Sequence, residues 1–294
     1  MPHAGSWVPF QTYDGSYTFF SDEFKEHFHS RDGAKAEAVQ KFSNVAKLTR
    51  KSRHASVKLL DVCYGLGYNS AASLETIWDE NPDCQITLYA LELDASVPLA
   101  AIAPPLINSW TPLVQDILTA IAHHQHCRAQ QLEANLLIGD ARHTIQQIID
   151  QGFQADAIFF DPFSPRRCPQ LWTVEFFTQV SRCLAPTGIL STYSRSASVR
   201  AAMVEAGLTI GTIPLDRPHR PHEWAQGTVA AFSSDDLHPL SQMEYEHLQT
   251  RAAIPFRDLT MNDTAEQILG RHQIEQQLSS KEATTQWRRR WGIH

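Results

Sequence analysis

From Val57 onward, segments typical of β-strands alternate with segments typical of helices, and this alternation restricts the fold more than any other feature of the chain. Helical stretches separate the first five strands, which predicts a parallel sheet with right-handed crossovers. The run 158–160 has no polar alternation, as expected for a strand buried on both faces. The sequence therefore predicts an α/β fold with a doubly wound, mostly parallel sheet and an antiparallel last strand. The expected strands are Val57–Val62, Ile86–Leu91, Asn135–Ile138, Ala157–Phe160, Gly188–Thr192 and Thr228–Phe232.

Two extensions flank this core. Aromatic and polar residues alternate around Asp14-Gly15, which predicts a β-hairpin. A helix is expected over residues 32–48, with Ser30 as its N-cap. The sequence predicts three parts: a hairpin and helix extension over 1–54, the Rossmann-like core over 55–235, and a helical tail that packs on the core over 236–294.

The composition excludes several classes of protein. Because 25 Lys+Arg stand against 32 Asp+Glu, the net charge is −7, and a nucleic-acid partner must meet a local basic patch. No stretch approaches ~18 consecutive apolar residues, and the N-terminus resembles no signal peptide, so we expect no membrane span and no secretion. Five scattered cysteines indicate reduced thiols in a cytoplasmic protein. The histidines of His123–Cys127 are neighbours on an expected helix and do not converge, so no metal site is predicted.

A glycine-containing loop, DVCYGLGYN at residues 61–69, follows the first core strand. Gly65 and Gly67 permit a tight turn and close backbone approach before a helix begins near Asn69. Dinucleotide enzymes share such a glycine pair, but Asp61 would repel a pyrophosphate and attract a cation. S-adenosyl-L-methionine carries an ammonium and a sulfonium, so we predict it as the cofactor, with Asp61 and Asn69 among the residues that bind it. A glycine-rich turn without a ligand is the alternative.

Two more acidic residues follow strands of the same sheet. Glu92 comes after the second strand and can accept both ribose hydroxyl protons, or it is a solvated charge at a strand end. Asp140 follows the next strand, where it can accept from an adenine amino group, cap the helix that follows, or do both. Ligands of open α/β sheets bind at the carboxyl ends of the strands. The three carboxylates together therefore predict a nucleoside-binding edge.

The fourth strand ends at an aspartate, Asp161, with two prolines in the loop that follows. A carboxylate here is suited to position an amine for methyl transfer, although aspartate before proline is also a common turn former. Phe163 can stack on a planar base. Arg166 and Arg167 can hold phosphates, or they are solvated loop charges. We predict Asp161 as the catalytic residue and the other three as substrate contacts.

Taken in order, these motifs resemble the family of tRNA 5-methylaminomethyl-2-thiouridine methyltransferases, in its form without a fused oxidase domain. The resemblance covers almost the whole chain. The matching segments are DGSYT at 14–18, EHFHSRDGA at 26–34, the glycine loop, DPFSP at 161–165, PQLWT at 169–173, TYS at 192–194 and WRRRW at 287–291.

The resemblance implies a class I S-adenosyl-L-methionine-dependent methyltransferase that methylates the amine of 5-aminomethyl(-2-thio)uridine at the tRNA wobble position. It also implies a tRNA partner and a separate oxidase that acts earlier on the same nucleoside; we expect a cytoplasmic monomer. It assigns Gly65 and Gly67 to the methionine part of the cofactor, Glu92 to the ribose, Asp140 and Ala141 to adenine, Asp161 to the substrate amine, and Tyr17 and Ser30 to closure over the cofactor.

The chain departs from the family pattern at Tyr64, Pro162 and Ser164, where Phe, Gly and Ala are more usual. Residues 216–224, DRPHRPHEW, replace a loop rich in Gly, Lys and Arg. Two functions of other classes remain as alternatives: aminopropyl transfer of the spermidine-synthase kind, and a non-catalytic module that binds the cofactor. We expect the basic residues to form one positive face for tRNA, made of Lys47–Arg53, Arg166, Arg167, Arg217, Arg220 and Arg288–Arg290.

Overall fold

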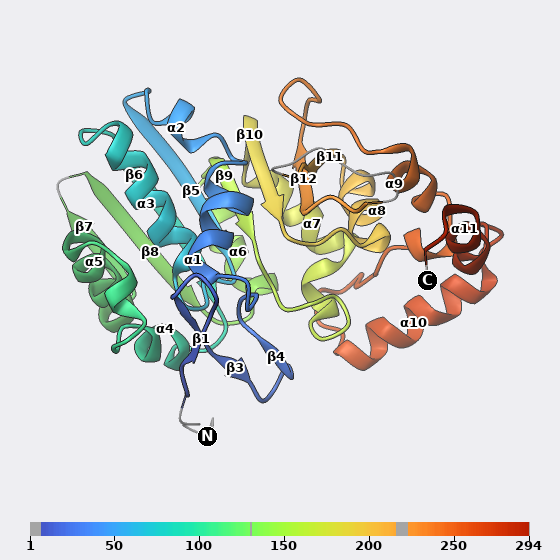
Figure 1. Ribbon diagram of the computed structural model, residues 1–294, viewed down its shortest axis with the longest axis horizontal. Coiled ribbons are helices and arrows are strands. Elements are labelled where there is room, and N and C mark those ends of the chain that lie inside the picture. Colours follow the sequence, from blue (N-terminus) through green and yellow to red (C-terminus); the bar gives the residue numbers. More distant parts are fainter. Residues whose placement is uncertain (1–6, 130, 216–222, 294) are drawn as a thin grey trace.

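A mixed sheet of eight strands forms the centre of the computed structural model, which describes residues 7–129, 131–215 and 223–293 (Figure 1). The five middle strands run parallel, β12 is antiparallel to both β10 and β11, and β7 is antiparallel to β8 at the other edge. The predicted doubly wound sheet is confirmed. In spatial order the strands are β11 (Thr209–Ile213), β12 (Gly227–Ala231), β10 (Leu184–Thr192), β9 (Ala155–Phe160), β5 (Ser56–Val62), β6 (Gln85–Glu92), β8 (Leu132–Ile138) and β7 (His126–Ala129).

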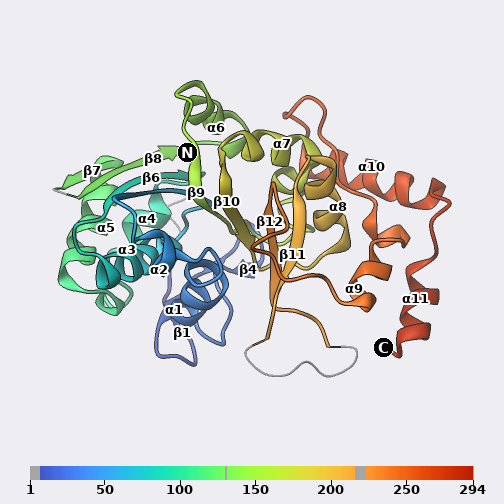
Figure 2. The same ribbon diagram turned by 90° about the horizontal axis from the view of Figure 1, so that it is seen from above.

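Helices cover both faces of this sheet, because successive strand residues point to opposite sides. In β5, Leu59 joins one apolar cluster and Leu60 the other; in β9, Phe159 and Phe160 divide in the same way. Figure 2 shows α3 and α5 on one side of the sheet and α6 and α7 on the other. The helices of the core are α3 (Tyr68–Glu80), α4 (Ser96–Ala101), η2 (Ile107–Ser109), α5 (Pro112–His124), α6 (Ala141–Asp150), η3 (Pro169–Trp172), α7 (Val174–Arg182) and α8 (Ala197–Glu205).

The predicted N-terminal hairpin is present, and a second one follows it. β1 (Phe10–Gln11) pairs with β2 (Tyr17–Thr18) across the turn at Asp14-Gly15, and β3 (Phe20–Ser21) pairs with β4 (Glu26–His27). The second hairpin lies beside the carboxyl ends of the central strands (Figure 1).

The helix expected over residues 32–48 is confirmed over 34–43, but turns occupy 44–47, where it was expected to continue. α1 (Ala34–Glu37) continues into a π-helical stretch η1 (Ala38–Ser43), and α2 (Leu48–Lys51) stands apart. Ser30 is not the N-cap, because its hydroxyl bonds Asp32 instead. The free N–H groups of α1 are satisfied from the first hairpin: the Ser16 hydroxyl accepts from Ala34 and Lys35, and the Asp14 carboxylate accepts from Ala36.

The C-terminal residues form helices that pack on the core through Phe256, Ile268 and Trp287, all of them buried. Trp287 stacks on His247 with ring centroids 4.3 Å apart, so it serves packing. No helix in the described ranges is long and apolar enough to cross a membrane. These C-terminal helices are α9 (Gln242–His247), η4 (Arg251–Ala253), α10 (Ala265–Leu278) and α11 (Thr284–Trp291).

Candidate functional site

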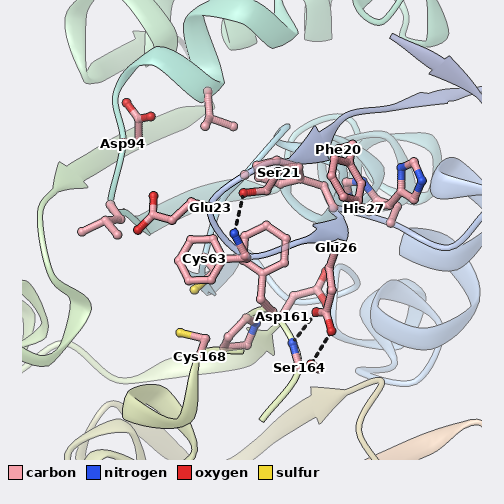
Figure 3. A pocket seen from close by; sticks show the side chains of 18 of the residues that line it. Phe20, Ser21, Glu23, Glu26, His27, Cys63, Asp94, Asp161, Ser164 and Cys168 are labelled. Atoms are coloured by element: carbon pink, nitrogen blue, oxygen red, sulfur yellow. Dashed lines mark hydrogen bonds between the residues drawn. The ribbon is translucent and has the colours of Figure 1, made fainter. Parts of the chain in front are cut away.

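A cavity of about 650 Å³ lies at the carboxyl ends of β5, β6 and β9, where the sheet pattern predicted a ligand (Figure 3). The second hairpin forms its other wall. Five predicted site residues line it: Ser30, Gly65, Glu92, Asp161 and Phe163. The site thus joins segments more than a hundred residues apart in the chain.

The glycine loop turns as the sequence predicts. Gly65 and Gly67 have φ values of 53° and 76°, in the left-handed region, and α3 begins directly after Gly67. A Cβ on Gly65 would lie 3.3 Å from the Phe28 ring, and one on Gly67 would lie 2.7 Å from the Tyr64 hydroxyl. Gly65 lines the cavity, whereas Gly67 shapes the turn behind it.

We expect Gly67→Ala to destabilise the fold by about 1–3 kcal/mol, because alanine disfavours a left-handed φ and its Cβ would have to displace Tyr64. Gly270→Ala is the matched control. Gly270 lies inside α10, and a Cβ there meets nothing within 4 Å, so this change should stabilise by about 0.5–1 kcal/mol. Urea unfolding of both variants measures the difference, and a shift in the same direction for both would contradict this account of the loop.

Glu92 is the last residue of β6, and its side chain holds the glycine loop through a hydrogen bond. Its carboxylate accepts the Gly65 N–H at 2.8 Å and the Asp94 N–H at 2.9 Å. Burial raises its pKa, although these backbone hydrogen bonds oppose the shift. Glu92 and Asp94 both line the cavity, so this wall offers carboxylate oxygens to a ligand with hydroxyl or amino groups.

Asp61 and Asn69 lie just behind the cavity wall. Asp61 is fully buried and accepts from the Ser70 hydroxyl at 2.6 Å, and burial raises its pKa to about 7. Asn69 donates from Nδ2 to the Asp161 carboxylate at 2.9 Å. The Oδ1 atoms of Asp61 and Asn69 are buried and have no partner among the residues that the structure describes. Buried acceptors without donors require an explanation, and a bound water or ligand that supplies the donors is one such explanation.

Asp161 lines the cavity at the end of β9, held by Asn69. Burial and the negative charge of Glu37 raise the pKa of its carboxyl to about 8, against the opposing hydrogen bond from Asn69. The loop that follows is fixed by the second hairpin: Glu26 accepts from the Ser164 hydroxyl and from its N–H, as the dashed lines in Figure 3 show. Phe163 stacks on Phe24 with ring centroids 4.4 Å apart. Asp161 therefore stands on a rigid loop.

The raised pKa of Asp161 gives a pH dependence of stability. Between its usual 3.8 and about 8 the folded chain keeps a proton that the unfolded chain has released, so the free energy of unfolding falls as pH rises through this range. Asp161→Asn has no carboxyl group to titrate, so its free energy of unfolding should not show this fall with pH. We expect its melting temperature to exceed that of the wild type by on the order of 10 °C at pH 8. The gap should close toward pH 4, and a gap independent of pH would show that Asp161 titrates normally.

Several predicted site residues do not line the cavity. Asp140 caps α6 by accepting the Arg142 N–H at 2.9 Å, and its carboxylate is also paired with the Arg142 side chain at 2.7 Å. The predicted capping function is present, and the predicted contact of Asp140 and Ala141 with adenine stays a prediction. Tyr17 also does not line the cavity. Its backbone N–H donates to the Tyr68 hydroxyl, and that hydroxyl donates to the Tyr17 carbonyl.

Sequence analysis missed part of the cavity wall contributed by the N-terminal extension. Phe24, Glu26, Phe28, Glu37 and Lys41 all line it. Two of these, Glu26 and Phe28, lie in the segment EHFHSRDGA, which carries the family resemblance. That motif could have indicated that the N-terminal extension contributes to the site.

Acidic partners offset part of the charge of the expected positive face, and the face itself stays a prediction. Lys47 and Arg50 both pair with Asp236, and Arg53 pairs with Glu80. Lys51 is buried and donates to two backbone carbonyls.

The other expected basic residues differ among themselves. Arg290 pairs with Glu246 and Glu282. Arg166, Arg167, Arg288 and Arg289 are exposed, without an ion pair in the described ranges. Arg217 and Arg220 lie outside the described residues. Within the described part of the chain, no group of three or more His, Cys, Asp or Glu is placed to hold a metal ion.

Comparisons with known proteins agree with this geometry. A family model described as S-adenosyl-L-methionine-dependent methyltransferase matches residues 104–216. The crystal structure of MnmC2 from Aquifex aeolicus superposes with a TM-score of 0.79 at 26% identity, covering 94% of this chain and 87% of that one. The fold, the cavity and the family match define a class I methyltransferase that uses S-adenosyl-L-methionine. It is related to the methyltransferase domain of the MnmC proteins.

Relatives in sequence show the same relationship. The bifunctional protein MnmC of Pseudomonas entomophila, named for tRNA 5-methylaminomethyl-2-thiouridine biosynthesis, is 38% identical over 128 residues, 43% of this chain and 19% of that protein. Uncharacterized protein MJ0670 of Methanocaldococcus jannaschii is 27% identical over 269 residues, 88% of this chain and 69% of that protein. The chain thus matches only a minor part of its bifunctional relative.

Proposed function

We propose that this protein transfers a methyl group to the primary amine of 5-aminomethyl(-2-thio)uridine at the tRNA wobble position. The supporting observation is Asp161, a carboxylate held by Asn69 on the wall of the cavity where the cofactor is expected. The names of the MnmC relatives support the choice of tRNA and of this nucleoside. The same proposal includes a cytoplasmic monomer that acts after a separate oxidase.

The residues of the cavity fit S-adenosyl-L-methionine. Glu92 offers a carboxylate for the ribose hydroxyls, and Gly65 permits close approach of the methionine part. Asp61 and Asn69 lie behind this wall and do not line the cavity, so their unpartnered acceptors would reach an ammonium group only through a bridging water. When bound, the cofactor supplies an activated methyl group on a positively charged sulfur.

The protein residues then position the nucleophile. Asp161 accepts an N–H bond from the substrate amine, so the nitrogen lone pair points along the line of attack. The cofactor would supply the methyl group to this nitrogen, and Asp161 or water would take the proton that the nitrogen gives up. Phe24, Phe28 and Phe163 enclose this end of the cavity and limit the access of water.

A methylation assay tests the proposal. The purified chain is incubated with labelled S-adenosyl-L-methionine and tRNA from cells lacking the modification, and the nucleosides are analysed by mass spectrometry. We expect a methyl gain on the wobble nucleoside. Cofactor binding by calorimetry without methyl incorporation would instead indicate a non-catalytic module. Turnover only with decarboxylated cofactor and putrescine would indicate aminopropyl transfer.

A further inference from the structure

A second cavity, of about 780 Å³, adjoins the first. The two share Ser30, Glu37, Lys41 and Tyr193 as lining residues. The Tyr193 hydroxyl donates to the Pro162 carbonyl at 2.9 Å, so the shared wall also fixes the loop that carries Asp161. A substrate in the second cavity would thus lie next to the proposed catalytic carboxylate.

The inner end of this second cavity is balanced in charge. Lys41 and Glu37 form an ion pair at 2.5 Å, and Glu37 also accepts the Ser30 N–H. Asp32, an exposed residue on the wall, accepts from the Ser30 hydroxyl. The ion pair leaves no net charge where the two cavities join, and Asp32 adds one negative charge to the polar wall, which suits a substrate that carries an amine.

The outer wall of the second cavity carries an arginine, Arg195. Arg195 is exposed, donates to the Ala225 carbonyl at 3.3 Å, and has no acidic partner among the described residues. Its guanidinium lies 5.7 Å from the centre of the Trp224 ring. Nearby Arg200, in contrast, is buried and paired with Glu244 at 2.9 Å.

The aromatic support beneath Arg195 is itself rigid. Trp224 packs against Trp287 and His247, with ring centroids 5.8 and 5.3 Å away. Trp287 is buried and comes from α11, so the C-terminal helix supports this wall. A cation held in place before the ligand arrives loses less side-chain freedom on binding.

We propose that the second cavity is the nucleotide-binding compartment for the RNA substrate, with Arg195 contacting a backbone phosphate beside the nucleotide that enters toward Asp161. This inference rests on the proposed function and adds to it the route of the substrate and a residue that holds it. A planar guanidinium with free donors matches a phosphate, and the cavity volume is within the range of pockets that bury small ligands.

The test compares Arg195→Ala with Arg182→Ala, a matched loss of one exposed arginine. Arg182 is the last residue of α7 and comes just before the amino end of β10, whereas Arg195 follows the carboxyl end of that strand; among the described residues Arg182 bonds only Gln179. For Arg195→Ala we expect the dissociation constant for tRNA, and its KM, to rise by about tenfold or more. The slope of log affinity against log salt should decrease by about 1. Arg195→Lys should keep that slope and lose part of the affinity.

Calorimetry with S-adenosyl-L-methionine should give the same affinity for both alanine variants. If Arg195→Ala binds and methylates tRNA as Arg182→Ala does, the inference is wrong while the proposed function stands. If the wild type binds tRNA but methylates none, the proposed function fails, and the salt slopes of binding still decide whether Arg195 contacts phosphate.

Discussion

Asp161→Asn is expected to slow methyl transfer to tRNA by about 10²–10⁴-fold while changing the affinity for S-adenosyl-L-methionine by less than about threefold. The amide has nearly the shape of the carboxylate, and its oxygen can still accept the hydrogen bond from Asn69. What is lost is the negative oxygen that orients the amine and can take its proton. Glu92 and Gly65, the proposed cofactor contacts, are untouched.

Single-turnover rates and calorimetry measure the two quantities separately. Asp156→Asn is the control, because Asp156 lies at the other end of the same strand, where it accepts the Lys58 N–H. That variant should keep both rate and affinity. Equal losses of rate and cofactor affinity in Asp161→Asn would mean that Asp161 serves the cofactor or the fold instead.

The pH profile gives a second readout for the same variant. Because burial and Glu37 raise the pKa of Asp161 to about 8, kcat/KM of the wild type should rise with pH up to that value, as the carboxylate forms. The asparagine variant has no group to titrate there, so only the titration of the substrate amine should remain in its profile. Identical profiles for both proteins would exclude Asp161 as a titrating group in the reaction.

The hydrophobic pattern of a single segment predicted those strands whose own residues are buried in the core. β9 was recognisable because Ile158, Phe159 and Phe160 are apolar without interruption, and the structure buries all three completely. β11 was missed because Gly211 divides a five-residue strand whose stability comes from pairing with β12. β7 was missed for a similar reason, since it is a mostly exposed edge strand.

The features that sequence did not predict depend on contacts between distant residues. The N-terminal helix is capped by Asp14 and Ser16, which lie in a hairpin, so the local sequence placed the cap wrongly at Ser30. The basic segment after that helix looked free, yet Asp236, from a distant part of the chain, pairs with both Lys47 and Arg50 and offsets one of their two positive charges.

The candidate site shows the same division. Gly65, Glu92 and Asp161 were found because each follows a strand, and strand ends of a parallel sheet meet at one edge. Glu37 and Glu26 were not found, because the packing of the N-terminal extension against the loop after β9 brings them to the cavity. Motifs at strand ends therefore locate such a cavity, whereas its outer wall requires the structure.

Glu92→Gln is expected to weaken S-adenosyl-L-methionine binding by about 30- to 100-fold, corresponding to about 2–3 kcal/mol for hydrogen bonds to a buried charged acceptor. The carboxylate accepts two backbone N–H bonds, from Gly65 and Asp94, and retains lone pairs for the ribose hydroxyls. Glutamine has one acceptor oxygen, and its NH₂ group must face an N–H donor or the ribose. Part of the loss therefore comes from the loop and part from the ligand.

Two further measurements separate those parts. Asp94→Asn changes the neighbouring carboxylate, which also lines the cavity but accepts from the N–H and hydroxyl of Ser96, and it should weaken binding less than Glu92→Gln. The wild type should bind a 2′-deoxyribose analogue of the cofactor more weakly than it binds the normal cofactor. Glu92→Gln should bind the analogue and the normal cofactor with nearly equal affinity. If the analogue discriminates equally in both proteins, Glu92 does not contact the ribose, and its function is to hold the glycine loop.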